Sequence, residues 1–185
     1  MADELIDVVD ESNNLTGEQK MKWDVHREGL WHRASYIWVY NSHGEVMIQL
    51  RTKRVNDSFS GKWDVSAAGH IGAGEDPTEG ALREVAEEIG LVVKKEDLEF
   101  SKIRKQEIIL PDKIIREFHY IYYVKFDGDT SSLNKQDAEV QELKFIPADE
   151  LEKDLAENPD RYVPHSDGQD DGWVEAIEEI KNRTK

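Results

Sequence analysis

An α/β or α+β sandwich is the fold class that this sequence predicts. Segments rich in β-branched and aromatic residues recur along its 185 residues, and at least two amphipathic helices lie between and after them. The order of strands and helices is mixed, as in a sandwich of helices and a sheet. No internal repeat, low-complexity tract or Gly/Ser-rich linker divides the chain, so residues 1–185 are expected to form a single domain.

The strands are expected where apolar and β-branched residues run between turn signals. Residues 5–10 form a short strand, whereas 16–30 are polar and ambiguous. Residues 31–52 contain the turn sequence Asn-Ser-His-Gly between two such runs, which predicts a β-hairpin. A second strand pair is expected over 98–110 and 113–126, and a further strand over 137–147.

The helices are predicted from caps and apolar spacing. Asp76 can cap a helix, Pro77 suits its first position, and Glu79 completes a capping-box-like start. Gly90 suits the C-terminal end of that helix. Residues 147–158 read as a second helix, and 170–185 as an amphipathic helix with Trp173 on its apolar side.

The composition restricts the kind of partner. Forty acidic residues against 24 basic ones give a formal net charge of −16, which repels a nucleic-acid backbone. The absence of cysteine excludes disulfides and thiolate sites and fits a reducing compartment. No apolar run reaches the roughly 18 residues of a membrane span, and the N-terminus lacks a secretory pattern. We therefore expect a cytoplasmic protein that binds neither membranes nor nucleic acid.

One helix concentrates negative charge. In residues 76–90, Glu84, Glu87 and Glu88 share one face beside an apolar stripe. Such carboxylates repel one another unless a hard divalent cation lies between them. Arg83 can orient one of them through its planar guanidinium group. A surface helix with an ordinary Arg83–Glu87 pair is the alternative reading of this segment taken alone.

The spacing of these residues resembles the signature of the Nudix hydrolases. The matching positions are Gly69, Glu75, Arg83, Glu84, Val85, Glu87, Glu88, Gly90 and Leu91. Seven positions require a single residue type, so a chance match is on the order of one in a hundred million per start point.

This resemblance implies an α/β/α sandwich with a mixed sheet, with a core at about residues 30–165. It implies hydrolysis of a small-molecule diphosphate, with Mg²⁺, or Mn²⁺ in its place, as cofactor. By the resemblance Glu84, Glu87, Glu88 and the Gly69 carbonyl hold the metal. Arg83 orients the carboxylates, and Glu75 supports the loop.

The general base is left open among several acids. The candidates are a glutamate of the signature and three further residues: Glu117, Glu139 and Glu142. The family places its base variably.

Residues outside the signature resemble the isopentenyl-diphosphate isomerase branch of the same family. By that comparison His32 and His70 match metal-binding histidines, His26 lies near another, and Glu117 matches the catalytic glutamate. The branch uses a cysteine immediately before its Gly-His pair, where this chain has Ala68. Alanine cannot transfer a proton, so we expect an isomerase-like scaffold that performs hydrolysis.

A basic, turn-rich stretch at 51–63 is exceptional in this acidic chain. Arg51, Lys53, Arg54, Lys62 and Trp63 are candidates for gripping the diphosphate. A solubilising loop is the alternative for any one of these cations.

Three functions remain to be distinguished. They are a pyrophosphohydrolase, an isomerase of allylic diphosphates, and a non-catalytic module that binds a diphosphate ligand. The substrate of the hydrolase is either a nucleoside diphosphate derivative or an isoprenoid-type diphosphate. A homodimer built on an exposed Trp173 or on the aromatic strands is a further expectation, with burial of the same residues in the core as the alternative.

Overall fold

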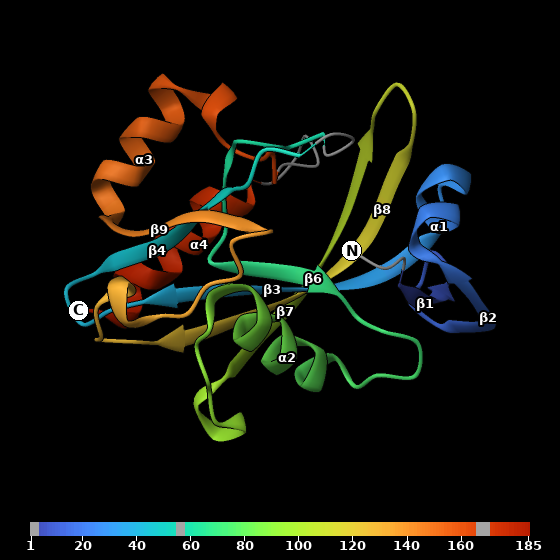
Figure 1. The fold of residues 1–185 in the computed structure, drawn as a ribbon, viewed down its shortest axis with the longest axis horizontal. Coiled ribbons are helices and arrows are strands. Elements are labelled where there is room, and N and C mark those ends of the chain that lie inside the picture. Colours follow the sequence, from blue (N-terminus) through green and yellow to red (C-terminus); the bar gives the residue numbers. More distant parts are fainter. Residues whose placement is uncertain (1–3, 55–57, 166–170) are drawn as a thin grey trace.

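Nine strands and four α-helices make up the computed structural model, which describes residues 4–54, 58–165 and 171–185 (Figure 1). The strands are β1 (Leu5–Val9), β2 (Leu15–Met21), β3 (Trp31–Tyr40), β4 (Glu45–Arg51), β5 (Trp63–Asp64), β6 (Ala67–His70), β7 (Glu99–Ile109), β8 (Ile114–Lys125) and β9 (Val140–Pro147). The helices are α1 (Lys22–Glu28), α2 (Pro77–Ile89), α3 (Ala148–Glu157) and α4 (Gly172–Arg183).

The sheet is mixed and is organised around β3. Strand β3 runs parallel to β8 from Trp31↔Arg116 to Tyr40↔Lys125, and β8 is antiparallel to β7. On its other edge β3 pairs with β6, and β4 pairs with both β9 and β5. Two branches of sheet therefore diverge from the β3–β4 turn.

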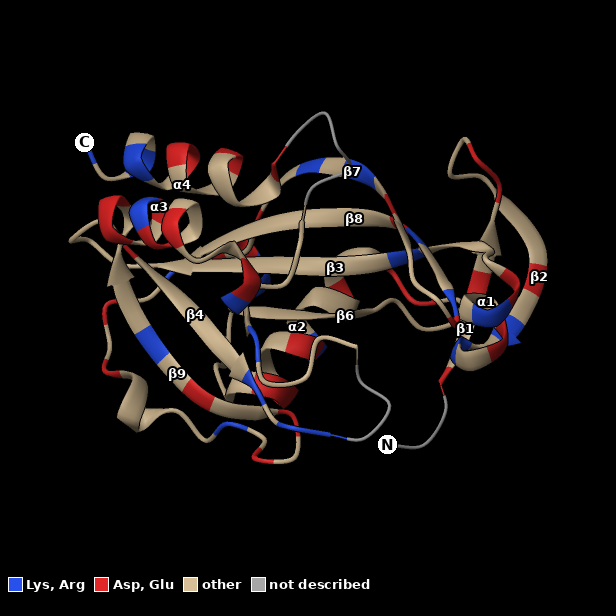
Figure 2. Ribbon diagram, turned by 90° about the horizontal axis from the view of Figure 1, so that it is seen from above, with Lys and Arg blue, Asp and Glu red and all other residues tan. Residues whose placement is uncertain are grey.

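Strand β3 is buried on both faces, because consecutive residues of a strand point to opposite faces and both sets are largely apolar here. Trp38 and Tyr40 of β3 pack in the cluster that contains α3 and α4, whereas Ile37 and Val39 pack in the cluster that contains α2. The expected α/β/α sandwich is thus confirmed. Figure 2 shows that Asp and Glu lie on every helix from α1 to α4, so the acidic excess is spread over the surface.

Helix α2 begins and ends at the residues that the sequence predicts. The Asp76 side chain accepts hydrogen bonds from the backbone N–H groups of Thr78 and Glu79, and Pro77 occupies the first turn. Gly90 ends the helix in the left-handed conformation, with φ of 71°. The Glu79 carboxylate pairs with Lys95.

The predicted 31–52 hairpin is wrong beyond its turn. β3 and β4 are joined at the expected turn, but Tyr40↔Val46 is the one registered pair between them in the described chain. The strands separate because β6 occupies the edge of β3 from Ala34 to Ile37, and β9 lies along β4. The Ser66 hydroxyl bridges the gap, since it accepts from Val39 N and donates to the Met47 carbonyl.

Other departures lie near the ends of the chain. The segment 16–30, which had no clear pattern, forms β2 and the short helix α1. Trp173 is 2% exposed and packs within the core of α3 and α4, so it is not available as a dimer surface. The predicted start of the last helix at residue 170 lies outside the described residues. No helix in the described ranges is long and apolar enough to cross a bilayer.

Candidate functional site

The acidic face of α2 has two buried members and one exposed member. Glu84 and Glu88 are 8% and 6% exposed and line a cavity of about 460 Å³, whereas the Glu87 side chain is 58% exposed. Ala81, Val85 and Ile89, on the adjacent stripe of the helix, are its fully buried apolar residues and anchor it in the core. The helix therefore presents its carboxylates at the boundary between the sheet and the cavity.

Arg83 connects the carboxylates of the signature. Its Nε and Nη2 each donate to Glu75, at 2.9 Å, and its Nη1 donates to Glu84 Oε1 at 2.6 Å. Glu87 lies further from the same Nη1, at 3.4 Å. Such a fork holds planar carboxylates in a fixed orientation. The Arg83–Glu87 pair exists, but it is the weakest of these contacts.

Glu88 is held by two neutral donors. Its Oε2 accepts from the Ala68 backbone N–H and from Gln49 Nε2, each at 3.0 Å. Burial, together with the nearby charge of Glu84, raises the pKa of Glu88 to about 8. Burial also raises the pKa of Glu84 to about 7, despite the opposing effect of Arg83. Two buried carboxylates with raised pKa values lack enough positive charge around them.

A glycine makes room for the Glu84 carboxylate. A Cβ added at Gly69 would lie 2.0 Å from Glu84 Cδ and 2.2 Å from its Oε1. Any other residue here would displace the carboxylate. The Gly69 carbonyl, which the sequence suggests as a metal ligand, accepts a hydrogen bond from Ser35 Oγ at 3.3 Å.

A second group of potential ligands lies on the same cavity. One ligand atom from each of His26, His32, His70 and Glu117 lies within 4.8 Å of the other three. His32 Nε2 is 3.2 Å from both His26 Nε2 and Glu117 Oε1, and His70 Nε2 is 3.5 Å from that oxygen. The structure thus brings together all three histidines and the glutamate that the sequence singles out.

The environment of this cluster favours neutral forms of His26 and His70 beside a charged Glu117 carboxylate. Burial and the neighbouring histidines lower the pKa of His26 to about 3, and burial lowers that of His70 to about 4. Burial by itself would raise the pKa of Glu117, but hydrogen bonds from His119, His32 and His70 outweigh it and hold the pKa well below its usual range. Neutral imidazole and ionised carboxylate are the forms that bind metals.

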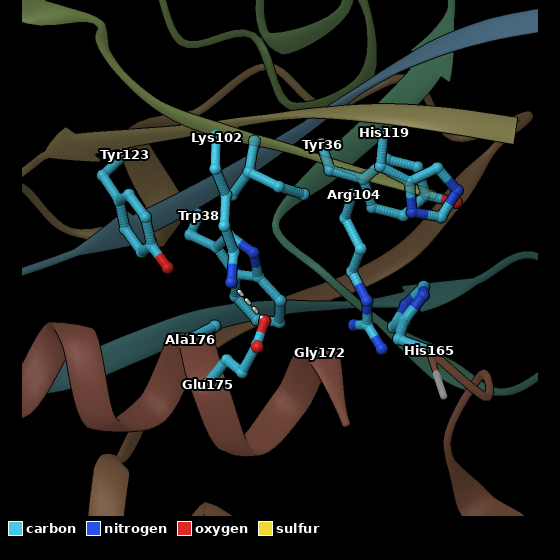
Figure 3. Close-up of a pocket in the computed structure, with 11 residues that line it drawn as sticks. Tyr36, Trp38, Lys102, Arg104, His119, Tyr123, His165, Gly172, Glu175 and Ala176 are labelled. Carbon is cyan, nitrogen blue, oxygen red and sulfur yellow. Dashed lines mark hydrogen bonds and ion pairs between the residues drawn. The ribbon is translucent and has the colours of Figure 1, made fainter. Parts of the chain in front are cut away.

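Behind the cluster, aromatic and imidazole rings continue the network. His119 Nε2 is 2.7 Å from Glu117 Oε2, and the Tyr36 ring stacks on His119 with centroids 3.8 Å apart. Tyr36 also meets the edge of His165. Figure 3 shows these rings beside Arg104 in a small cavity of about 20 Å³ between the sheet and α4. This cavity is too small for a substrate. Tyr36 and His165, which line it, also line the large cavity and so separate the two.

The sequence-predicted basic residues divide into two groups. Arg51 and Arg54 line the large cavity. Among the described residues, Lys53 and Lys62 are not part of that lining, and Trp63 is 7% exposed within the core, with Lys144 Nζ 4.2 Å from its ring centre. Of the five predicted diphosphate contacts, Arg51 and Arg54 therefore lie on the large cavity, and contact of any of the five with a diphosphate stays a prediction.

The candidate bases are separated in the same way. Glu117 and Glu139 line the cavity, with Glu139 3.8 Å from Arg54 Nη2. Glu142 is exposed on β9 and is not part of the described lining. The geometry keeps Glu117 and Glu139 as the candidates outside α2.

Sequence reasoning missed several residues of the site. Asp64 Oδ1 is 2.8 Å from His165 Nε2, and Asp64 Oδ2 accepts from Arg51 Nη1 at 3.1 Å, so one buried carboxylate holds an arginine and a histidine. Burial would raise the pKa of Asp64, but these two partners lower it overall. Glu4 and Lys22 also reach the cavity from the N-terminal segment.

With this geometry established, comparison with known proteins defines the class. Residues 30–166 match the NUDIX domain, and the chain belongs to the Nudix family. It is 34% identical over 170 residues to Nudix hydrolase 3 of Arabidopsis thaliana, covering 89% of this chain but 22% of that protein. The chain thus spans about a fifth of that relative's length.

Two further relatives define the branch. The chain is 35% identical over 157 residues to an uncharacterised Nudix hydrolase of Clostridium acetobutylicum, covering 84% of this chain and 75% of that one. It is 30% identical over 161 residues to the isopentenyl-diphosphate Δ-isomerase of Serratia proteamaculans, covering 87% and 86%. Resemblance to the isomerase branch is thereby confirmed.

Solved structures confirm the fold. The structure of DR0079 from Deinococcus radiodurans covers 98% of this chain and all of its own, with a TM-score of 0.66 at 19% identity. The MutT protein of Methanosarcina mazei Go1 covers 84% of this chain and 96% of its own, with a TM-score of 0.57 at 20% identity.

Proposed function

We propose that this protein is a Mg²⁺-dependent pyrophosphohydrolase that cleaves a diphosphate linkage in a small molecule. The observation that carries the proposal is the pair of buried carboxylates, Glu84 and Glu88, facing a cavity that two arginines also line. The Nudix family typically uses a divalent metal and acts on small-molecule diphosphates, which is consistent with this pairing of acids and bases.

The donor set fits a hard divalent cation. Glu84 and Glu88 supply buried carboxylate oxygens, Glu87 supplies an exposed one, and Gly69, whose carbonyl is the further proposed ligand, lies against the Glu84 carboxylate. Oxygen ligands of this kind suit Mg²⁺ and also Mn²⁺. When bound, such a cation neutralises charge on the phosphoryl group and makes an attacking water more acidic.

The chain's own residues then position the substrate. The guanidinium groups of Arg51 and Arg54 can grip phosphate oxygens. Arg51 Nη1 donates a hydrogen bond to Asp64, so the Arg51 guanidinium group is already oriented before the substrate binds. We propose that Glu139, which lines the cavity, accepts a proton from the attacking water, with Glu117 as the alternative acceptor when its carboxylate binds no metal.

The His26–His32–His70–Glu117 cluster is proposed as a second metal site. Convergent imidazoles suit a borderline ion such as Zn²⁺ or Fe²⁺ better than Mg²⁺. A bound ion there would add positive charge to the cavity wall that faces the α2 carboxylates.

Two other functions have less support. An isomerase of allylic diphosphates would use a cysteine where Ala68 lines the cavity, and the Ala68 side chain carries no proton to transfer. A non-catalytic diphosphate-binding module would not need the complete set of signature carboxylates.

The reaction can be identified directly. The products of diphosphate cleavage (phosphomonoesters, pyrophosphate or phosphate) would be separated and quantified with Mg²⁺ across nucleotide sugars, dinucleotides, nucleoside triphosphates and isoprenoid diphosphates, with Glu87→Gln as control. We expect cleavage of one class and its loss in the variant. Full activity in Glu87→Gln would overturn the metal assignment. Product rearrangement without diphosphate cleavage would favour the isomerase, and tight binding without turnover the binding module.

A further inference from the structure

The N-terminal hairpin of β1 and β2 is joined to the loop that precedes α2. The Ala73 N–H donates to the Leu5 carbonyl at 3.0 Å, and the Gly74 N–H donates to Asp7 Oδ2 at 2.7 Å. Ile6, between them, is fully buried and forms an isolated antiparallel bridge with Gly72. Figure 1 shows β1 and β2 beside this loop, at the end of the molecule away from α3.

This attachment places Glu4, the residue before β1, at the signature. The Glu4 backbone carbonyl accepts from Lys22 N at 2.7 Å, which fixes its backbone against α1. Its side chain, 31% exposed, lines the cavity together with Glu84. Glu4 Oε1 lies 3.7 Å from Arg83 Nη2.

Arg83 does not satisfy the Glu4 carboxylate. The guanidinium lies within 4 Å of four acids, namely Glu4, Glu75, Glu84 and Glu87. Glu75 takes the Nε and Nη2 donors at hydrogen-bond distance. At 3.7 Å the Glu4 oxygen is beyond hydrogen-bond range, so it gains weak attraction and retains its capacity to bind a cation.

We propose that Glu4 is a further carboxylate of the divalent-metal centre, contributed by a segment outside the Nudix-matched residues 30–166. It binds the ion directly or through one of the waters that Mg²⁺ keeps. The inference rests on the proposed function, because it assigns Glu4 to the same metal. A carboxylate that served only as a partner of Arg83 would affect folding but not the affinity for metal.

The test is a calorimetric Mg²⁺ titration of the metal-stripped, full-length protein. Mg²⁺ is the probe because it prefers carboxylates to the imidazoles of the histidine cluster. Wild type is compared with Glu4→Gln, and with Glu18→Gln as the matched control. Glu18 lies on β2 of the same hairpin, is exposed, and pairs with Lys20.

We expect Glu4→Gln to raise the Mg²⁺ dissociation constant roughly tenfold, the size of effect seen when groups that support a metal site are removed. Glu18→Gln should leave it unchanged. Equal dissociation constants for wild type and Glu4→Gln would overturn this inference while the proposed function stands. Wild type that binds no Mg²⁺ would overturn the proposed function itself.

The rise in melting temperature on adding Mg²⁺ provides a second readout. It should be smaller in Glu4→Gln than in Glu18→Gln, with all three metal-free proteins giving the same circular dichroism spectrum. If Glu4→Gln does not fold, Glu4→Asp takes its place, since it keeps the charge and shortens the reach. If Mg²⁺ raises the melting temperature of Glu4→Asp as much as that of wild type, Glu4 has no role at the metal.

Discussion

The Glu84 carboxylate occupies the space in which a side chain on residue 69 would begin. A Cβ at Gly69 would lie 2.0 Å from Glu84 Cδ, far inside van der Waals contact. The carboxylate is at the same time bonded to Arg83 on its other side, at 2.6 Å. The position of the Glu84 carboxylate therefore depends both on the lack of a side chain at Gly69 and on the hydrogen bond from Arg83.

Gly69→Ala should abolish turnover while the fold is retained. The added methyl group displaces the end of a side chain rather than backbone, so the Glu84 carboxylate moves and the metal site is lost. We expect a fall in kcat of at least about 100-fold, as for other displaced catalytic groups. Turnover and melting temperature measured together check this. An unaltered kcat would show that the Glu84 position is not needed.

Glu84 and Glu88 should make a contribution to the stability of the metal-free protein that is lost as the pH rises from about 5 to 8. The pKa values of Glu84 and Glu88 are about 7 and 8 in the folded protein, against an ordinary 4.5. Between these limits the native state keeps protons that the unfolded chain has released, so the contribution of these two residues to the free energy of unfolding falls with pH.

The experiment compares urea unfolding in EDTA for wild type and a Glu84→Gln/Glu88→Gln variant. As the pH rises from about 5 to 8, the free energy of unfolding of wild type should fall relative to that of the variant. The lowered pKa values of His26 and His70 act in the opposite direction but are common to both proteins. Parallel curves would contradict the prediction. Mg²⁺ at 100 times its dissociation constant should add about 2.7 kcal/mol to wild type.

Asp64→Asn should weaken substrate binding more than it slows the chemistry. Asp64 holds Arg51 by a charged hydrogen bond at 3.1 Å, and the neutral amide holds it less firmly. A loss of about 1.4 kcal/mol, near the lower end for a hydrogen bond to a charged group, would raise KM about tenfold. Lys153→Gln is the control, because Lys153 is exposed on α3, pairs with Glu157 and is not part of the described cavity lining. Equal KM values for wild type and Asp64→Asn would exclude this role.

Ile177→Ala should destabilise the fold without altering the site. Ile177 is 1% exposed in the cluster between α4 and the sheet. Truncation of a buried isoleucine to alanine costs about 2–5 kcal/mol. Urea unfolding of wild type and Ile177→Ala measures this loss of stability. A loss below about 1 kcal/mol would mean that α4 is loosely packed against the sheet.

Local patterns in the sequence predicted much of this architecture. The caps of α2 and the β-branched and aromatic residues along β8 are local signals, and both elements form as expected. The 31–52 hairpin failed because the edges of β3 and β4 are taken by β6 and β9, which the local pattern does not reveal. Strand β2 has no apolar alternation, since all seven of its residues are exposed or half-buried.

The site was predictable where it matches a signature and not elsewhere. The glutamates of α2 and the histidine cluster follow from family resemblance, and the structure brings each group together. Asp64 and His165 are 101 residues apart, so only the folded chain reveals their contact. No sequence motif marks Glu4 as a site residue. Its side chain reaches the cavity because Ile6 anchors β1 in the core.

The most direct test is the rate of diphosphate cleavage, measured from its separated products, by wild type and Glu84→Gln with Mg²⁺ and with EDTA, on whichever diphosphate the substrate panel identifies. We predict turnover by wild type with Mg²⁺ alone, and a loss of at least about 1000-fold in the variant or on chelation, because charge stabilisation by a metal contributes several kcal/mol. Wild-type turnover that persists in EDTA, or a Glu84→Gln rate within twofold of wild type, would contradict the account.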